Sequence, residues 1–182
     1  HTIIKPRVAL VQLKSDNKIV KKLAGVRANV LLRLVENGVV KRQEEGEMLF
    51  TSYGISGICA MQLSRDVAIG LDNNMKEGVL VNLVATFADN VDDFRAFMES
   101  YSKKMMKRTV SQLLDNFLNY KLGNAILEDL GISSSMFYYQ LSGEMKQKLC
   151  SMLVAFPLKI VGTNSFLEAQ VCSGGVSMKE IN

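Results

Sequence analysis

The sequence predicts an α+β fold in which a six-stranded antiparallel β-barrel carries an inserted all-α helical subdomain. Apolar and polar residues alternate from Val26 to Val35, which is the period of a strand. The period becomes that of amphipathic helices across residues 89–156, and the strand pattern resumes after Pro157. We therefore assign residues 1–88 and 157–182 to the barrel and residues 89–156 to the helical subdomain.

The strands before the helical segment are predicted by apolar runs and one turn. The first strand is expected at Val8–Leu13 and the second at Val26–Val35. Asn37 and Gly38 tolerate the positive φ of a tight hairpin, so Val39–Thr51 is expected to run back beside the second strand. The short apolar run Val79–Ala85 predicts the fourth strand.

Between the third and fourth strands, one helix is expected from Ser56 to Ala68. Its apolar residues recur at helical spacing, and Ser56 is placed to cap its first free N–H groups. Ser56 is interpreted as a cap and not as a nucleophile, because Gly54-Ile55-Ser56-Gly57 lacks the spacing of a serine hydrolase motif.

The helical segment shows three amphipathic stripes, with apolar residues three or four apart. The stripes are Val91, Phe94, Met98, Tyr101 and Met105; Val110, Leu113, Leu114, Phe117 and Leu118; and Leu122, Ile126 and Leu130. Gly131 suits the left-handed end of the third helix, Ser133–Ser135 and Ser142 are candidate caps for two more, and Pro157 ends the last. The remaining strands are expected at Leu158–Gly162 and Phe166–Cys172, and they would close the barrel.

The residue types argue against chemistry within this chain. His1 is the only histidine, and Cys59, Cys150 and Cys172 lie far apart in apolar surroundings, so we expect core thiols, no disulfide and no metal site. Neither a phosphate-binding Gly-x-x-x-x-Gly-Lys nor a Gly-x-Gly-x-x-Gly loop is present. We therefore expect no catalytic residue here, and any cofactor must be held elsewhere.

The charge pattern indicates neither a nucleic-acid nor a membrane partner. The formal charge is +4, from 22 Lys and Arg against 18 Asp and Glu. Lys103, Lys104, Lys107 and Arg108 form a basic cluster that could contact phosphates, but Asp92 and Asp93 begin the same helix that these cations end, as the helix dipole favours. The chain contains no apolar run of about 18 residues and no signal-peptide pattern, so a cytoplasmic location is expected.

Two glycine-bearing segments carry a family resemblance. They are Gly46–Gly57 (GEMLFTSYGISG) and Ala169–Val176 (AQVCSGGV). Both resemble conserved stretches of bacterial NAD(P)/FAD-dependent oxidoreductases, a flavoprotein family that includes aminoacetone oxidase and a bile-acid-pathway reductase. Further agreement lies in His1–Val11, Leu23–Gly25, Ile160–Thr163 and Glu180–Asn182. The sequence departs from the family pattern at Ser52, where the family usually has His; at Ile58, in place of Pro; and at Cys172-Ser173, in place of Thr-Ala.

In that family, a β-barrel with a helical bundle is inserted into a split FAD-binding Rossmann domain. The resemblance implies that this chain is the insert of a longer protein, with the Rossmann domain of the same polypeptide as its partner and a small-molecule substrate. It also places Ser173, Gly174, Gly175 and Val176 near the flavin of the parent protein. The other interpretation of Gly174-Gly175 is a chain reversal leaving the barrel, and that of Gly54 and Gly57 is a tight turn and the first helical turn.

The expected function is therefore that of a domain capping the substrate site of an FAD-dependent oxidoreductase, with NAD(P)H or oxygen as its electron partner. The insert alone is expected to be inactive and to bind no FAD. The alternative is a stand-alone protein- or RNA-interaction module, because the barrel is similar to the second barrel of translation factors. A Gly-x-Gly-x-x-Gly motif upstream in the reading frame would distinguish the two.

Overall fold

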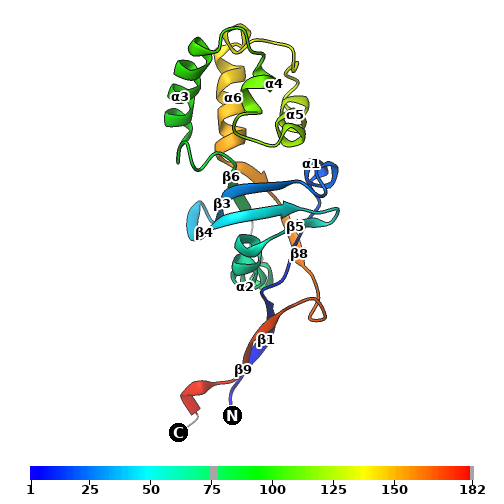
Figure 1. Ribbon diagram of the computed structural model, residues 1–182. Coiled ribbons are helices and arrows are strands. Elements are labelled where there is room, and N and C mark those ends of the chain that lie inside the picture. The colour runs from blue at the N-terminus through cyan, green and yellow to red at the C-terminus, as the bar shows by residue number, and fades with distance from the viewer. Residues whose placement is uncertain (74–77, 181–182) are drawn as a thin grey trace.

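The computed structural model describes residues 1–73 and 78–180 as two antiparallel sheets and a set of α-helices (Figure 1). Ile181 and Asn182, part of the resemblance above, lie outside the described residues. The elements in chain order are β1 (Ile3–Ala9), β2 (Leu13–Ser15), α1 (Lys18–Lys22), β3 (Arg27–Glu36), β4 (Val39–Phe50), β5 (Gly54–Ser56), α2 (Ile58–Asp72), β6 (Val79–Asn82), α3 (Val91–Lys104), α4 (Val110–Leu114), α5 (Tyr120–Asp129), the 3-10 turn η1 (Tyr138–Gln140), α6 (Gly143–Val154), β7 (Phe156–Leu158), β8 (Ile160–Thr163), β9 (Val171–Val176) and η2 (Met178–Glu180).

The larger sheet has the strand order β7-β6-β3-β4-β5-β2-β8. Its longest pairing is the predicted hairpin of β3 and β4, which turns at Asn37 (φ 53°) and Gly38 (φ 74°). Val30, Leu32 and Leu34 point from one face of β3 into the core, so the predicted alternation is confirmed.

The hydrogen bonds between the described strands form an open order of seven strands and not the predicted closed six-stranded barrel. The sheet has seven strands, and its edges β7 and β8 are consecutive in the chain, separated by Lys159. Across this residue the chain leaves β6 and joins β2. The predicted strand Leu158–Gly162 is therefore divided at Lys159, whose carbonyl accepts a hydrogen bond from Ser15 Oγ at 2.8 Å.

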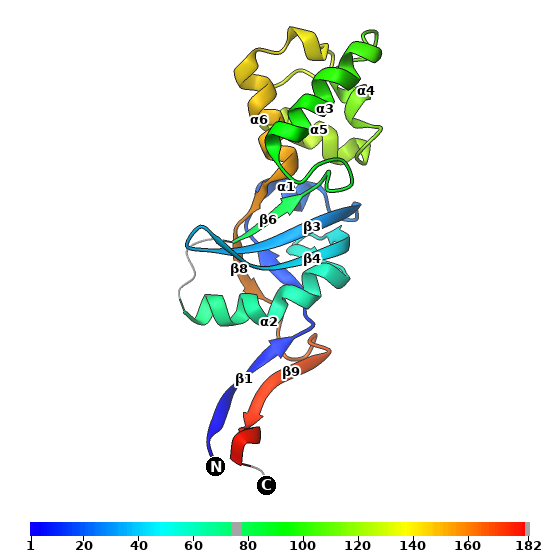
Figure 2. The ribbon, with the colours of Figure 1, turned by 90° about the vertical axis from the view of Figure 1, so that its left-hand side faces the viewer.

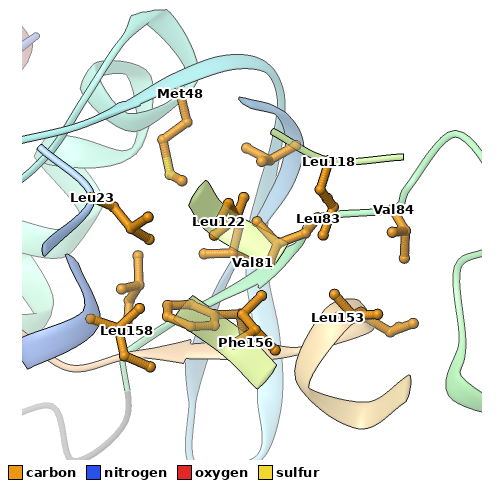
Figure 3. Close-up of a cluster of buried hydrophobic side chains, with 14 of the residues drawn as sticks. Leu23, Met48, Val81, Leu83, Val84, Leu118, Leu122, Leu153, Phe156 and Leu158 are labelled. Carbon is orange, nitrogen blue, oxygen red and sulfur yellow. The ribbon is translucent and has the colours of Figure 1, made fainter. Parts of the chain in front are cut away.

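The helices α3 to α6 lie between β6 and β7 in the chain and pack against one end of the sheet (Figures 1 and 2). The buried side chains of helices and sheet form one continuous cluster. In Figure 3, Met48 of β4, Leu122 of α5 and Leu153 of α6 belong to the same group of side chains. The two predicted segments thus share a hydrophobic core.

The three predicted amphipathic helices are confirmed as α3, α4 and α5, although α4 is short. Ser142 caps α6, because its Oγ accepts a hydrogen bond from the N–H of Met145 at 3.1 Å. Gly131 follows α5 with a φ of 66°, as predicted. The expected helix after Ser133–Ser135 is wrong: those serines stabilise a turn, in which Ser133 Oγ accepts from the N–H of Ser135, and only the short η1 follows.

Two other predicted boundaries are wrong for local reasons. Ser56 lies in β5, and Gly57 precedes α2 without any side-chain cap. The strand expected at Val79–Ala85 ends at Asn82, whose Oδ1 accepts from the N–H of Val84 and whose Nδ2 donates to the carbonyl of Ala88. These hydrogen bonds turn the chain towards α3.

The first and last predicted strands also differ from the structure. Val8–Leu13 is interrupted at Leu10, whose φ is 51°, so β1 and β2 belong to different sheets. The expected strand Phe166–Cys172 begins only at Val171, because Ser165 and Glu168 hold a turn before it.

The smaller sheet is a two-stranded ribbon formed by β1 and β9. It extends away from the body of the molecule, beyond α2, and the first and last described parts of the chain lie side by side at its far end (Figures 1 and 2). Among the described residues, no helix has the length and apolar character needed to cross a membrane.

Candidate functional site

Ser173, Gly174, Gly175 and Val176, predicted to lie near a flavin, form the outer part of β9. Gly175 is paired with Ile4 and Val176 with Ile3, so these residues continue the ribbon. The alternative interpretation of Gly174-Gly175 as a chain reversal is wrong, because both residues lie within a strand.

Gly174 is required by the packing of the ribbon itself. The pairing shifts between Ile4 and Arg7, so two residues of β1, Lys5 and Pro6, lie opposite the single residue Gly174. Gly174 has a φ of 104°, and a Cβ there would lie 2.6 Å from the carbonyl oxygen of Lys5. This bulge leaves no room for a side chain.

Gly175 has the same backbone conformation without the same contact. Its φ is 105°, yet a Cβ built on it meets nothing within 4 Å. The positive φ favours glycine, and the open space lets another molecule or domain approach the backbone closely. Of the two glycines, Gly175 is the one whose surroundings in this chain leave room for a ligand.

A charged cluster lies where β1 of the ribbon meets the end of α2, and we call this place the root of the ribbon. Asp72, the last residue of α2, accepts hydrogen bonds from Lys5 Nζ at 2.9 Å and from Arg7 Nε at 2.8 Å. These hydrogen bonds from Lys5 and Arg7 lower the pKa of the Asp72 carboxyl group below its ordinary value. Sequence reasoning missed the cluster, since Asp72 is 67 residues from Lys5 and no spacing rule relates them.

The cluster borders an open cleft of about 590 Å³. The cleft lies between β1, the end of α2, and the segment that begins in β8. Its lining includes the charged side chains of Lys5, Arg7 and Asp72 together with Val161 and Phe166. A cleft with cations and an aromatic ring can hold a small organic molecule that carries a polar group.

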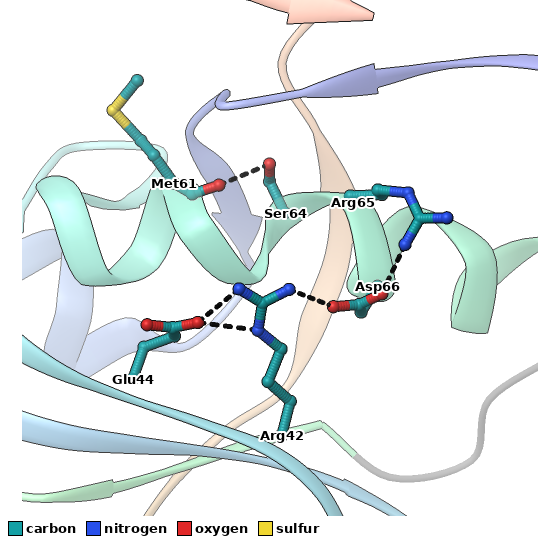
Figure 4. Close-up of polar contacts among 6 residues, drawn as sticks. All are labelled: Arg42, Glu44, Met61, Ser64, Arg65 and Asp66. Carbon is teal, nitrogen blue, oxygen red and sulfur yellow. Dashed lines mark hydrogen bonds and ion pairs between the residues drawn. The ribbon is translucent and has the colours of Figure 1, made fainter. Parts of the chain in front are cut away.

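Helix α2 connects this region to the body. Ser64 is fully buried on α2, where its Oγ accepts a hydrogen bond from the N–H of Val11 and donates to the carbonyl of Met61. Helix α2 is also joined to β4: Arg42 of β4 donates hydrogen bonds to Glu44 of the same strand and to Asp66 of α2, each at 2.7 Å (Figure 4). These two acidic partners raise the pKa of Arg42, which remains a cation.

Large apolar side chains are exposed along the ribbon and beside the cleft. Ile3 is 63% exposed, Met178 82% and Leu167 96%. Apolar side chains gathered in this way are typical of a surface that contacts another protein or domain.

Gly54 and Gly57 of the Gly46–Gly57 segment are explained by the fold. A Cβ at Gly54 would collide with the carbonyl oxygen of Leu13, and one at Gly57 would collide with that of Glu47. Gly54 therefore allows β5 and β2 to pair, and Gly57 allows α2 to begin against β4. The family's His position, Ser52, is exposed.

The three cysteines separate into two groups. Cys59 and Cys150 are buried, as predicted, and burial raises the pKa of both thiols. The prediction for Cys172 is wrong: it is exposed, because β9 belongs to the ribbon and not to the core. Among residues 1–73 and 78–180, no three His, Cys, Asp or Glu side chains gather as a metal site would require.

Comparisons with known proteins agree with the resemblance stated above. The family model of the HI0933-like protein barrel and H2TH domain matches residues 7–171. The 3-dehydro-bile acid delta(4,6)-reductase of Clostridium scindens is 31% identical over 181 residues, covering 100% of this chain and 44% of the reductase. The chain thus spans less than half the length of this relative.

Proposed function

Because the chain belongs to the HI0933-like flavoprotein family, we propose that it is the insert domain of an FAD-dependent oxidoreductase and caps the substrate site of that enzyme. The FAD would be bound by a Rossmann domain formed by the flanking parts of the same polypeptide. The flavin supplies the electron transfer, and this chain supplies binding surface and shape.

The observation that carries the proposal is the ribbon of β1 and β9. The first and last described parts of the chain lie at its far end, so the chain enters and leaves the body through two paired strands (Figure 1). This is the geometry needed to insert a domain into a loop of another domain without separating the two ends of that loop. The exposed Ile3 of β1 and Val176 of β9, with Met178 just beyond, give this end of the molecule an apolar surface for the neighbouring domain to cover.

The residues present fit a flavin beside the ribbon. The open space at Gly175 would allow the backbone of β9 to lie against a flat ring, while Ser173 and Val176 flank it on the same strand. The cleft at the root of the ribbon would then face the substrate. The relative is named as a bile acid reductase, so we infer that the substrate is a small organic molecule and that the electron donor or acceptor is NAD(P)H or oxygen.

We further infer that the larger sheet closes as a six-stranded barrel in which β7 and β8 form one bent strand, and β5 takes the place of the predicted strand Phe166–Cys172. Only Lys159 separates them, and each supplies one edge of the sheet. The division into residues 1–88 with 157–182 and residues 89–156 stays a prediction, as does the cytoplasmic location.

The test is to express the complete reading frame and the 182-residue chain separately. The complete protein should purify with bound flavin, which NAD(P)H reduces or oxygen reoxidises. The 182-residue chain should purify colourless and show no FAD binding in titration calorimetry. A complete protein that cannot be loaded with flavin would contradict the proposal, and it would favour an interaction module.

A further inference from the structure

The segment Lys103–Arg108 connects α3 to α4 at the end of the molecule farthest from the ribbon (Figure 2). The ribbon, through which a neighbouring domain would be attached, lies at the opposite end of the molecule. Its six residues contain four cations and no acidic residue.

The four cations, Lys103, Lys104, Lys107 and Arg108, are all exposed. None of them takes part in the ion pairs found among the described residues. Nearby lysines differ: Lys146 is paired with Glu99 and Lys148 with Glu144. The positive charge of the segment is therefore not neutralised by ion pairing within this part of the chain.

Two exposed methionines stand between the cations. Met105 is 42% exposed and Met106 is 64% exposed, and both border a small hollow of about 100 Å³ that Leu113 and Tyr139 also line. Consecutive long apolar side chains flanked by pairs of cations suit a surface that is anionic outside and apolar beneath.

The aromatic rings of α3, those of Phe94, Phe97 and Tyr101, pack against each other and against Phe117 and are not free to stack on nucleic-acid bases. Phe94 is fully buried, and Phe97 stacks on Tyr101 with ring centroids 5.7 Å apart. Phe117 packs edge-on against these rings, so they complete one another's contacts. Base stacking would require rings that are free on one face.

We propose that the segment Lys103–Arg108 binds an anionic lipid surface, with the cations at the lipid headgroups and Met105 and Met106 inserted between them. The sequence alone argued against a membrane partner because the net charge is small. The structure instead gathers four unpaired cations and two exposed methionines at one tip. A bilayer needs no complementary pocket, so the small volume of the hollow is no obstacle to this partner.

The test measures binding of the 182-residue chain to vesicles by sedimentation. Vesicles of phosphatidylcholine mixed with phosphatidylserine should bind the chain, and added salt should weaken the binding. Vesicles of phosphatidylcholine alone should bind it much less. Replacing all four cations with Gln should lower partitioning on the order of a hundredfold, since each cation contributes to attraction by the surface.

Matched variants distinguish binding by the segment Lys103–Arg108 from a general effect of the positive charge of the chain. Lys103→Gln with Lys104→Gln should weaken binding about tenfold, whereas Lys18→Gln with Lys21→Gln, an equal loss of charge on exposed α1 positions, should have little effect. Met105→Ser with Met106→Ser should also weaken it. Circular dichroism of each variant checks folding.

Two results would overturn the proposal. One is equal vesicle binding by the folded four-cation variant and the unchanged chain. The other is the absence of vesicle binding together with tight binding of duplex DNA that depends on the same cations, which would make the tip a nucleic-acid contact.

Discussion

The body and the ribbon of this molecule are stabilised in different ways. The body buries one continuous core in which many side chains, such as Phe50 and Phe156, have no exposed surface. The ribbon has only two strands, and of its residues only Val8 and Ala9, at the end next to α2, are buried. A two-stranded ribbon is marginally stable alone, so the ribbon depends on what it contacts while the body does not.

The largest expected difference between the two regions is the effect of removing an apolar side chain. Phe156→Ala in the body should lower the free energy of unfolding by about 3–5 kcal/mol, because it leaves a cavity in the core. Ile3→Ala on the ribbon should change it by less than about 0.5 kcal/mol. Thermal unfolding by circular dichroism, with a single sharp transition for the unchanged chain, provides the measurement. Equal losses would show that the ribbon belongs to the same cooperative unit.

The next effect concerns the pairing of the ribbon. Gly174→Val combines an unfavourable positive φ with a collision against the Lys5 carbonyl, so it should destabilise the ribbon by about 1–3 kcal/mol. Hydrogen exchange at the amides of β1 and β9 should accelerate, while exchange in β3 stays unchanged. Faster exchange in β3 as well would mean that the bulge also supports the body.

A smaller effect should follow from acid at the root of the ribbon. Asp72 has a lowered pKa in the folded protein, so its stabilising contribution is complete above the ordinary carboxyl pKa of 3.8 and is lost as pH falls through the lower folded value. Hydrogen exchange of β1 between pH 5 and pH 2 should show this loss, and Asp72→Asn should remove the part due to this group. An unchanged pH profile in Asp72→Asn would contradict the assignment.

The smallest expected effect is a difference in the reactivity of cysteine thiols between the ribbon and the body, which can be measured without changing the stability of the protein. A thiol reagent should label Cys172 quickly in the folded chain, while Cys59 and Cys150 should react only after unfolding. Mass spectrometry of the labelled peptides gives the result directly. Rapid labelling of Cys150 would show that the helices open more readily than their burial indicates.

The sequence predicted the body better than the ribbon, for a physical reason. Local patterns determine the body: alternation fixed the buried face of β3, and Ser142 was recognisable as a cap for α6. The ribbon depends on long-range pairing, since Ile4 meets Gly175, and no local pattern reports such a partner. The break at Leu10 and the late start of β9 were missed because nearby apolar residues continue the strand pattern on both sides.

The candidate site was likewise predicted from the sequence only in part. Gly174 and Gly175 were recognisable as a motif, but only the structure separates a glycine required by the bulge from one with open space beside it. The cluster of Lys5, Arg7 and Asp72 joins β1 to the end of α2, so it exists only once the chain has folded.

The central claim is that Gly175 lies against the flavin of the complete protein, and Gly175→Val in that protein tests it most directly. We predict that flavin affinity falls on the order of tenfold, while the body of the isolated 182-residue chain melts at nearly the same temperature. Gly174→Val is the control, because it damages the pairing of the ribbon more. If Gly175 contacts the flavin, its replacement should weaken flavin binding at least as much as that of Gly174. A complete Gly175→Val protein with full flavin occupancy and turnover would contradict the account.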